Sequence, residues 1–374
     1  REINDNRIVS ILFDIMDYSK PKSMGLAGSA GMHWTRLVRW PNVGLQVVHL
    51  GLGGLLFLAL WFILGRSWGV DAFGEFNYLY TFTGFFGIVI DFGLDLLLTR
   101  IVAAHSPGIP RSLIILKAGV ILVAACIFGF IAWLIGRIEP MVLVLLMGGV
   151  VFLSSTTLLN GLLRGLDRLD IEAKVGLLQK FLFVISAFIG VWFLDKGPVY
   201  MALCYSLSHM AGLGLTIAVL PARGKQVPDD QEALGKQIKE VLPIWGVTVF
   251  TFLSLRVDVF MLRWLADSSS LGHYTAGFRL IEGFTLLGVA YMAACFPRMV
   301  FNRADREIFL HLLIRSAGLL IAVGGLIFCG CLLLGAPVLL LVYGPGFSPA
   351  SKVLVWLSGT LPLYFVSLLL GQSF

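Results

Sequence analysis

Charged residues that interrupt long apolar runs are the strongest chemical feature of this sequence. Arg256 and Asp258 share one such run, Arg279 and Glu282 lie in the next, and Asp91 lies in a much earlier one. A charged side chain near the centre of a membrane helix costs about 2.5–3.5 kcal/mol on insertion scales, so each of these residues requires a physical reason. An arginine guanidinium binds phosphate in two-pronged geometry, whereas a carboxylate in the same surroundings can hold a cation.

The spacing of the four residues in the second half predicts the directions in which they point. Arg279 and Glu282 are three positions apart, which puts both on one face of a helix. Arg256 and Asp258 are two positions apart, about 200° around a helix, and therefore point to opposite sides. Three interpretations remain open. The residues line a cavity, they form a structural ion pair between helices, such as Asp258 with Arg279, or they extend towards a membrane surface.

Other polar residues within apolar runs are weaker candidates for a site. Asp91 and Asp95 are four positions apart, so we expect them on one face of a helix, where two close carboxylates suit a proton or sodium site. Asp95 can also simply pair with Arg100. For Lys180, extension towards the cytoplasmic surface competes with a place in a cavity. The remaining candidates are Gln46, His49, Asn160, Gln179 and His209.

The composition indicates that membrane-spanning helices carry these residues. Of the 374 residues, 58% are hydrophobic and 13% charged, whereas soluble domains carry about 25% charged residues. The apolar runs have about the 20–25 residues that cross a hydrocarbon core as a helix. Lipid cannot satisfy free backbone groups, and the alternating ten-residue pattern of a membrane barrel is absent. The sequence therefore predicts an all-α integral membrane protein.

Ten membrane spans are predicted, separated by short segments rich in charge, glycine and proline. With the N-terminus in the cytoplasm, 21 of the 28 Lys and Arg residues fall on the cytoplasmic side and five on the outer side, which supports this orientation. The net charge of +6 comes from these loops and not from a basic patch, which argues against nucleic-acid binding. Aromatic residues near span ends, Trp61 among them, are expected to anchor at the membrane interface. The spans cover roughly residues 43–65, 75–99, 112–136, 140–163, 174–194, 198–220, 240–264, 271–297, 308–334 and 350–371.

A short internal repeat divides the chain into two halves. Residues 70–76, after the first span, and 268–274, after the seventh, both combine an outer loop with apolar, glycine, polar and aromatic residues that open the next helix. Parallel repeats of this kind are a transporter architecture, with the substrate site between the halves. Because the chain stops after span ten, we expect the second half to lack two or more helices. The expected domains are a polar N-terminal segment 1–42, a first six-helix lobe 43–222, a cytoplasmic linker 223–239 and a truncated second lobe 240–374.

Motifs of catalysis are absent from the sequence. It contains no HExxH, GxSxG or GxxxxGK[ST] motif and no cluster of metal ligands. The five cysteines lie in apolar runs without CxxC spacing, which is typical of small buried side chains. We therefore expect no enzyme activity, no catalytic residue, no metal and no cofactor.

Four stretches of the chain resemble a known family. They include residues 64–76 with 91–100, residues 160–165 (NGLLRG), residues 256–258 (RVD) with 271–276 (LGHYTA) and 279–282 (RLIE), and residues 343–347 (YGPGF). In these stretches the chain resembles the Wzx-type oligosaccharide and polysaccharide flippases of the multidrug/oligosaccharidyl-lipid/polysaccharide (MOP) exporter superfamily, which are related to lipid II flippases and MATE exporters. The N-terminal segment and the missing final helices depart from the family's pattern.

The resemblance implies a fold and a function. The fold has two six-helix transmembrane lobes related by a pseudo-two-fold axis. The function is alternating-access transport that flips a polyprenyl-diphosphate-linked oligosaccharide across the bacterial cytoplasmic membrane for surface polysaccharide biosynthesis. The implied partners are this lipid-linked glycan, membrane lipids, a proton or sodium ion for coupling, and a polysaccharide polymerase or glycosyltransferases.

The expected residue roles combine the chemistry of the charged and polar side chains with the cavity between lobes that the resemblance implies. The expected substrate-binding residues are Arg256, Arg279, Asn160, Lys180 and Gln46, and the expected ion-coupling residues are Glu282, Asp258 and Asp91. Two other functions stay open. One is a cation-coupled exporter of small molecules, and the other is a membrane scaffold of a polysaccharide synthase that does not itself transport.

Overall fold

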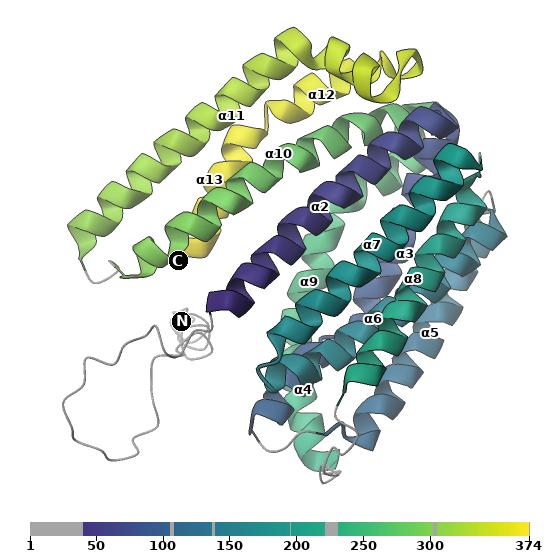
Figure 1. Ribbon diagram of the computed structural model, residues 1–374, viewed down its shortest axis with the longest axis vertical. Coiled ribbons are helices and arrows are strands. Elements are labelled where there is room, and N and C mark those ends of the chain that lie inside the picture. The colour runs from purple at the N-terminus through teal and green to yellow at the C-terminus, as the bar shows by residue number, and fades with distance from the viewer. Residues whose placement is uncertain are drawn as a thin grey trace, which may run out of the picture. The chain divides into compact units, whose positions relative to one another are not determined.

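The computed structural model of the protein describes residues 40–104, 108–136, 139–194, 196–220, 231–301 and 305–373. The chain divides into two compact units, Arg1–Val43 and Gly44–Phe374, and the second holds nearly all of the described residues. Every regular element in the described part is a helix, which confirms the predicted all-α class (Figure 1).

The helices follow the apolar runs, and local signals set many of their ends. Pro140 and Pro198 occupy the first turns of α6 and α8, where the missing N–H of proline leaves no helical hydrogen bond unmade. Gly136 ends α5 in the left-handed conformation with φ 67°, which glycine adopts without a steric penalty. Asp305 begins α11 by accepting hydrogen bonds from the backbone N–H groups of Glu307 and Ile308.

We divide the helices into two sets at the polar stretch before α9, which follows the boundary predicted from the sequence. We call α2–α8 the first lobe and α9–α13 the second lobe. The first lobe comprises α2 (Trp40–Trp68), α3 (Val70–Asp91), α4 (Leu94–Ala104), α5 (Arg111–Ile135), α6 (Pro140–Gly165), α7 (Leu169–Phe193) and α8 (Pro198–Val219). The second lobe comprises α9 (Gln231–Leu265), α10 (Ser268–Phe301), α11 (Arg306–Tyr343), the short η2 (Pro345–Phe347), α12 (Ala350–Ser358) and α13 (Leu361–Ser373).

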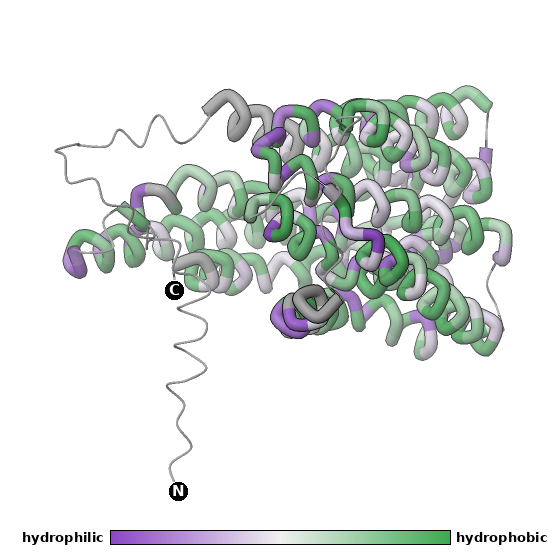
Figure 2. The backbone as a smooth tube through the Cα atoms, turned by 90° about the horizontal axis from the view of Figure 1, so that it is seen from below, coloured by the Kyte–Doolittle hydropathy of each residue, from purple (hydrophilic) through white to green (hydrophobic). Residues whose placement is uncertain are grey.

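The length and apolarity of the helices fit a multi-pass membrane protein. Within the described residues, eight helices are long and apolar enough to cross a membrane, and the count is nine if α12 and α13, bent by 42°, form one span. Figure 2 shows hydrophobic residues along most of the helical backbone, and many large apolar side chains are exposed, as expected of surfaces that face lipid.

The predicted second span, residues 75–99, corresponds to α3 and α4 and is not among these eight helices. Polar side chains such as Asn77, Thr81 and Thr83 lower the hydropathy of α3, and all three are buried. Helices α5, α6, α9 and α10 pack against α3, so its polar groups face protein and not lipid. The helix stops at Asp91 because Phe92 and Gly93 adopt positive φ angles of 50° and 66°.

The two ends of the helix bundle are named by a residue at each. The Trp68 end is where α2 ends and α3 begins, and the indole N–H of Trp68 donates there to the carbonyl of Lys196 at 3.1 Å. The Arg164 end is the opposite one, where α6 ends and α7 begins.

Helices α3 and α10 form the largest contact between the lobes. They cross closely at the Trp68 end, because a Cβ on Gly74 would lie 2.6 Å from the backbone nitrogen of Gly272. Both glycines belong to the predicted repeat segments, so each segment supplies the small residue that lets the other approach. Helix α2 lies between α10 and α7 (Figure 1), with Leu58 against Gly283 on one side and Gly53 against Lys180 on the other.

Candidate functional site

A buried arginine, Arg279, lies where the two lobes meet. Its side chain on α10 is 2% exposed, and Nη2 donates to Oδ1 of Asn77 on α3 at 2.8 Å. The guanidinium carbon lies 3.8 Å from the centroid of the Trp61 ring on α2, a cation–π contact. Arg279, on α10 of the second lobe, therefore contacts two helices of the first lobe, α2 and α3. The expectation that Trp61 anchors at the membrane interface is wrong, because Trp61 is 2% exposed inside the protein.

Glu282 joins Arg279 to a second arginine. Nη1 of Arg279 donates to Glu282 Oε2 at 2.6 Å, and Nη2 of Arg256 on α9 donates to Glu282 Oε1 at 3.0 Å. Arg256 also lies over the ring of Phe278, 4.6 Å from its centroid. Two guanidinium groups share one carboxylate, so the group carries one formal positive charge in excess. We call Asn77, Arg256, Arg279 and Glu282 the interlobe cluster.

Two members of this cluster, Arg279 and Glu282, line a cavity of about 160 Å³ between α2 and α10, which we call the interlobe cavity. Trp61 and Phe57 form its wall on α2, and Arg279 and Glu282 supply its charged groups. The side chain of Glu282 is 38% exposed, whereas that of Arg279 is almost fully covered. A ligand in the cavity therefore meets Glu282 and competes with it for the arginines.

Asp258 takes part in a different contact. Its carboxylate accepts a short hydrogen bond from the hydroxyl of Tyr274 on α10 and also accepts from the backbone N–H of Val259 at 2.8 Å. The ion pair considered between Asp258 and Arg279 is therefore not formed, because Arg279 pairs with Glu282 three positions along its own helix.

A larger cavity of about 280 Å³ lies in the first lobe, and we call it the first-lobe cavity. Both Asn160 on α6 and Lys180 on α7 line it. The aliphatic part of Lys180 lies against α2, where a Cβ on Gly53 would come within 2.6 Å of its Cδ. Phe57 lines this cavity and the interlobe cavity, so the two adjoin at its ring. The side chain of Gln46, the remaining predicted substrate residue, lies outside the described part of the chain.

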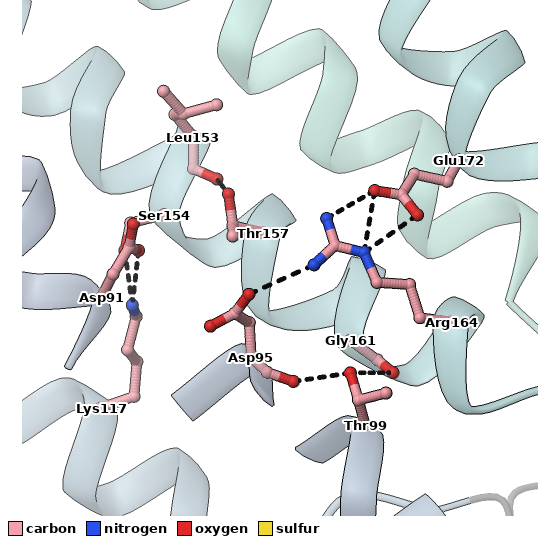
Figure 3. Close-up of polar contacts among 10 residues, drawn as sticks. All are labelled: Asp91, Asp95, Thr99, Lys117, Leu153, Ser154, Thr157, Gly161, Arg164 and Glu172. Carbon is pink, nitrogen blue, oxygen red and sulfur yellow. Dashed lines mark hydrogen bonds and ion pairs between the residues drawn. The ribbon is translucent and has the colours of Figure 1, made fainter. Parts of the chain in front are cut away.

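Asp91 belongs to a polar cluster inside the first lobe, shown in Figure 3. Lys117 on α5 lies with Nζ 3.4 Å from Asp91 Oδ1 and donates to the backbone carbonyl of Ile90 at 2.8 Å. The hydroxyl of Ser154 on α6 makes short hydrogen bonds with both Lys117 and Asp91. We call Asp91, Lys117 and Ser154 the first-lobe cluster.

Asp95 does not share a helix face with Asp91, although their spacing predicts it. The break at Phe92 and Gly93 separates them, and Asp95 instead pairs with Arg164 on α6 at 3.3 Å (Figure 3). Arg164 also binds Glu172 on α7 at 2.6 Å, so one arginine joins two acids from different helices. The pair considered between Asp95 and Arg100 is wrong, because Arg100 lies 3.8 Å from Glu240.

The glycine of the NGLLRG segment has a packing role in this chain. A Cβ on Gly161 would lie 2.4 Å from the backbone oxygen of Asp95, so only glycine allows α6 to approach α4 there. Thr99 donates to the Gly161 carbonyl at 3.1 Å and completes the contact.

Sequence reasoning missed Lys117 and Asn77. The distribution of basic residues puts Lys117 on the cytoplasmic side, yet it is buried and neutralises Asp91. Its position as the sixth residue of the predicted span 112–136 was the available signal, because a lysine at a surface stands at the end of such a run. Asn77 carried no signal beyond being an amide in a helix, and only the crossing of α3 with α10 brings it to Arg279.

Comparison with known proteins bears on the fold and the family. The chain is similar in structure to the lipid II flippase MurJ in an inward closed conformation, with a TM-score of 0.66 and 13% identity over 87% of this chain and 74% of that one. It is also similar to a multidrug resistance MATE family transporter of the MOP superfamily in an inward-facing conformation, with a TM-score of 0.60 and 15% identity over 87% of this chain and 82% of that one. An outward-facing MATE family transporter of the same superfamily gives a TM-score of 0.54 at 16% identity, over 87% and 78% of the two chains.

At these identities the solved structures show a shared fold. None of the curated proteins matches the chain. The sequence pattern of the family described as polysaccharide biosynthesis protein matches residues 41–302, which is more than two thirds of the chain. The predicted relationship to polysaccharide biosynthesis proteins is thereby confirmed, and the fold is the one predicted from the resemblance to MOP-superfamily transporters. The chain belongs to the polysaccharide biosynthesis protein family and has the two-lobed membrane fold of the MOP superfamily.

Proposed function

We propose that the protein is a transporter that flips a polyprenyl-diphosphate-linked oligosaccharide across the bacterial cytoplasmic membrane by alternating access. The interlobe cluster carries this proposal. It places a buried arginine at the contact between the lobes, beside a cavity, with positive charge in excess of the available carboxylate. A site of this kind favours an anion whose binding depends on how the lobes are arranged.

A diphosphate has the charge and geometry to replace Glu282. Each phosphate presents several oxygen acceptors, and Arg256 and Arg279 approach Glu282 from different helices with one guanidinium nitrogen each. When a diphosphate replaces Glu282 between the two arginines, both guanidinium groups keep an anionic partner. The cost of burying their charges therefore remains offset.

The same exchange suggests how a cation is coupled to transport. A displaced Glu282 is a carboxylate in a partly dry cavity, and it takes up a proton or a sodium ion to balance its charge. Asp91 and Asp258 are already held by Lys117 and Tyr274. Of the three predicted coupling residues, Glu282 is therefore the one we favour.

The contacts at the Trp68 end support a conformation that is closed to the outside. Gly74 and Gly272 meet there, and the ring of Tyr343 on α11 lies against Gly65 of α2. If the N-terminus is cytoplasmic, as the distribution of Lys and Arg predicts, the Trp68 end is the outer one.

The other functions fit the site less well. A pocket with excess positive charge repels the cationic compounds that many small-molecule exporters carry. A scaffold requires that buried charges pair off and that no cavity adjoins them. In the interlobe cluster two arginines share one carboxylate, so one positive charge is in excess, and two cavities lie beside the buried polar groups.

The experiment that tests this function uses the full-length gene in its own host. The gene is deleted, and surface polysaccharide is measured after return of the wild type or of the variants Arg256→Ala, Arg279→Ala and Glu282→Ala. We expect the wild type to restore the polysaccharide and the three variants to fail at equal membrane levels. Arg111→Ala, at an exposed arginine that begins α5, is the matched control and restores it. A deletion that leaves surface polysaccharide unchanged overturns the proposal.

A further inference from the structure

The first-lobe cavity contains more polar groups than the fold requires. It lies between α3, α6, α7 and α8, and Phe57 of α2 closes one side. Gln179 on α7 is 8% exposed, and neither its amide nor that of the half-buried Asn160 makes a hydrogen bond to another described residue. Buried amides in native proteins are nearly always paired, so the buried amide of Gln179 is expected to pair with a polar molecule in the cavity, and the half-buried amide of Asn160 can pair with the same molecule.

Two hydroxyls and an imidazole add to this set. Within the described residues, the side-chain hydroxyls of Tyr80 and Tyr205 make no hydrogen bond, although both rings line the cavity. Nδ1 of His209 lies 2.7 Å from the backbone oxygen of Tyr205, which leaves Nε2 for another partner. Each of these groups would lose hydrogen-bond energy if the cavity held nothing polar.

The position of Gln179 also depends on a specific small residue. A Cβ on Gly212 of α8 would lie 2.7 Å from the amide carbon of Gln179, so the glycine leaves the space in which this side chain lies. The amide is thereby held against α8 at the wall of the cavity.

Apart from Lys180, whose aliphatic part lies against α2, and Glu172, the polar groups of the lining are uncharged, and they suit a polyhydroxylated ligand. Amides, phenols and an imidazole offer donors and acceptors together, whereas a site for an anion would offer donors alone. The acid at the margin, Glu172, is held by Arg164 at 2.6 Å. Aromatic faces from Phe57, Tyr80 and Phe183 border the same space and suit the apolar C–H face of a sugar ring.

We propose that the first-lobe cavity is a saccharide subsite. It binds the sugar attached to the diphosphate, while Arg256 and Arg279 hold the diphosphate in the adjoining interlobe cavity. Phe57 lines both cavities, so a ligand with its sugar in one and its diphosphate in the other would lie against this ring. The inference rests on the proposed function, since it assigns the sugar of the same lipid-linked substrate.

The test compares two kinds of lipid on the purified protein in lipid nanodiscs. One probe is polyprenyl diphosphate, and the others are polyprenyl-diphosphate-linked glucose, galactose and N-acetylglucosamine. We expect at least one sugar-bearing lipid to bind roughly tenfold more tightly than the bare lipid, because several hydrogen bonds of about 1 kcal/mol are added. Tyr205→Phe and Gln179→Leu should each reduce this preference by roughly three- to tenfold and leave binding of the bare lipid unchanged.

A matched control and a separate variant distinguish failure of the saccharide subsite from failure of the proposed function. Tyr200→Phe removes a hydroxyl from the same helix outside the cavity, where it donates to Ser186, and should preserve the preference for sugar. If all the lipids bind equally and Arg279→Ala weakens all of them, the saccharide subsite is overturned and the proposed function stands. If no lipid binds to the wild type, both are overturned.

Discussion

The interlobe cluster and the first-lobe cluster are built from the same kinds of side chain but join different parts of the molecule. The first-lobe cluster holds α3 to α5 and α6, which all belong to one lobe. The interlobe cluster holds α3 of the first lobe to α10 of the second, and α10 to α9. A movement of rigid lobes leaves the first set of contacts intact and changes the contact between α3 and α10.

The two clusters also differ in their balance of charge. In the first-lobe cluster one lysine meets one aspartate and a serine hydroxyl completes the hydrogen bonds, so no charge remains for a ligand. In the interlobe cluster two arginines meet one glutamate. The balanced charges of the first-lobe cluster indicate a structural role. The excess positive charge of the interlobe cluster indicates a site that can bind an anion.

The largest effect on stability is expected from breaking the first-lobe cluster at Asp91. Asp91→Ala leaves Lys117, whose side chain is 6% exposed, as an unpaired buried charge. Loss of one partner from a fully buried pair typically costs about 3–5 kcal/mol, and because the side chain of Asp91 is itself 36% exposed we expect a loss at or below the lower end of that range. We expect a sharp fall in the unfolding temperature and in the membrane level, measured by thermal denaturation of the detergent-solubilised protein.

The matched double variant separates structure from ion coupling at this position. Asp91→Ala with Lys117→Met removes both charges and should recover most of the lost stability, because no unpaired charge remains. Transport by the double variant should then approach the wild-type rate. A stable double variant that does not transport would instead give Asp91 the coupling role that the sequence suggested.

The interlobe cluster should show the opposite pattern. Arg279→Lys keeps a positive charge but replaces the planar guanidinium that reaches Asn77 and Glu282 together. We expect transport to fall at least about tenfold, while the unfolding temperature falls less than in Asp91→Ala. The measurement is the rate of flipping of a labelled polyprenyl-diphosphate lipid in proteoliposomes. If Arg279→Lys lowers the unfolding temperature as much as Asp91→Ala does, the two clusters do not differ in their roles.

The sequence predicted features that follow from hydropathy and helical spacing. The apolar runs predicted membrane helices, and the three-residue spacing of Arg279 and Glu282 predicted that both lie on one helix face, but the ion pair between them was not predicted. The repeat segments pointed to Gly74 and Gly272 without revealing that they touch.

The wrong predictions share one cause. The periodicity of a sequence predicts which residues share a helix face, but it does not predict which residues of other helices they contact. Asp91 and Asp95 were expected on one face because nothing in the sequence marks Phe92 as a residue with positive φ. Trp61 was expected at the membrane interface because it lies near the end of a span, but in the structure it packs against Arg279 of the other lobe. The first-lobe cavity joins residues 57 and 209, and no local pattern predicts such an assembly.

A third prediction concerns the glycine contact at the Trp68 end, where both lobes take part. In Gly272→Ala the new Cβ would lie 2.1 Å from the backbone oxygen of Val70, so α3 and α10 must separate. Overpacking of this kind costs about 1–3 kcal/mol, which favours the arrangement open at this end by roughly tenfold. Spin labels on Gly197 and Ser270, one on each lobe, should report a larger population of long distances. The labels require a background in which the five cysteines are replaced.

The control for this substitution is Gly129→Ala on α5. No atom lies within 4 Å of the position that the new Cβ would take, so the same chemical change meets no neighbour. We expect the label distances to match those of the parent protein. If Gly272→Ala leaves the distances unchanged as well, the crossing of α3 and α10 does not hold the lobes together at this end.

The smallest effect is expected from an ion pair beside that crossing. Glu75 on α3 lies 3.2 Å from Arg263 on α9 and accepts a hydrogen bond from Ser268 on α10 at 2.5 Å. Glu75→Gln keeps the hydrogen bond and removes the charge, and the carboxylate is a third exposed, so the loss is about 1 kcal/mol or less. The same pair of spin labels should show a shift of up to about fivefold in the two populations, in the same direction as for Gly272→Ala. A shift larger than that of Gly272→Ala would mean that charge, and not the close approach of two glycines, holds the lobes together at the Trp68 end.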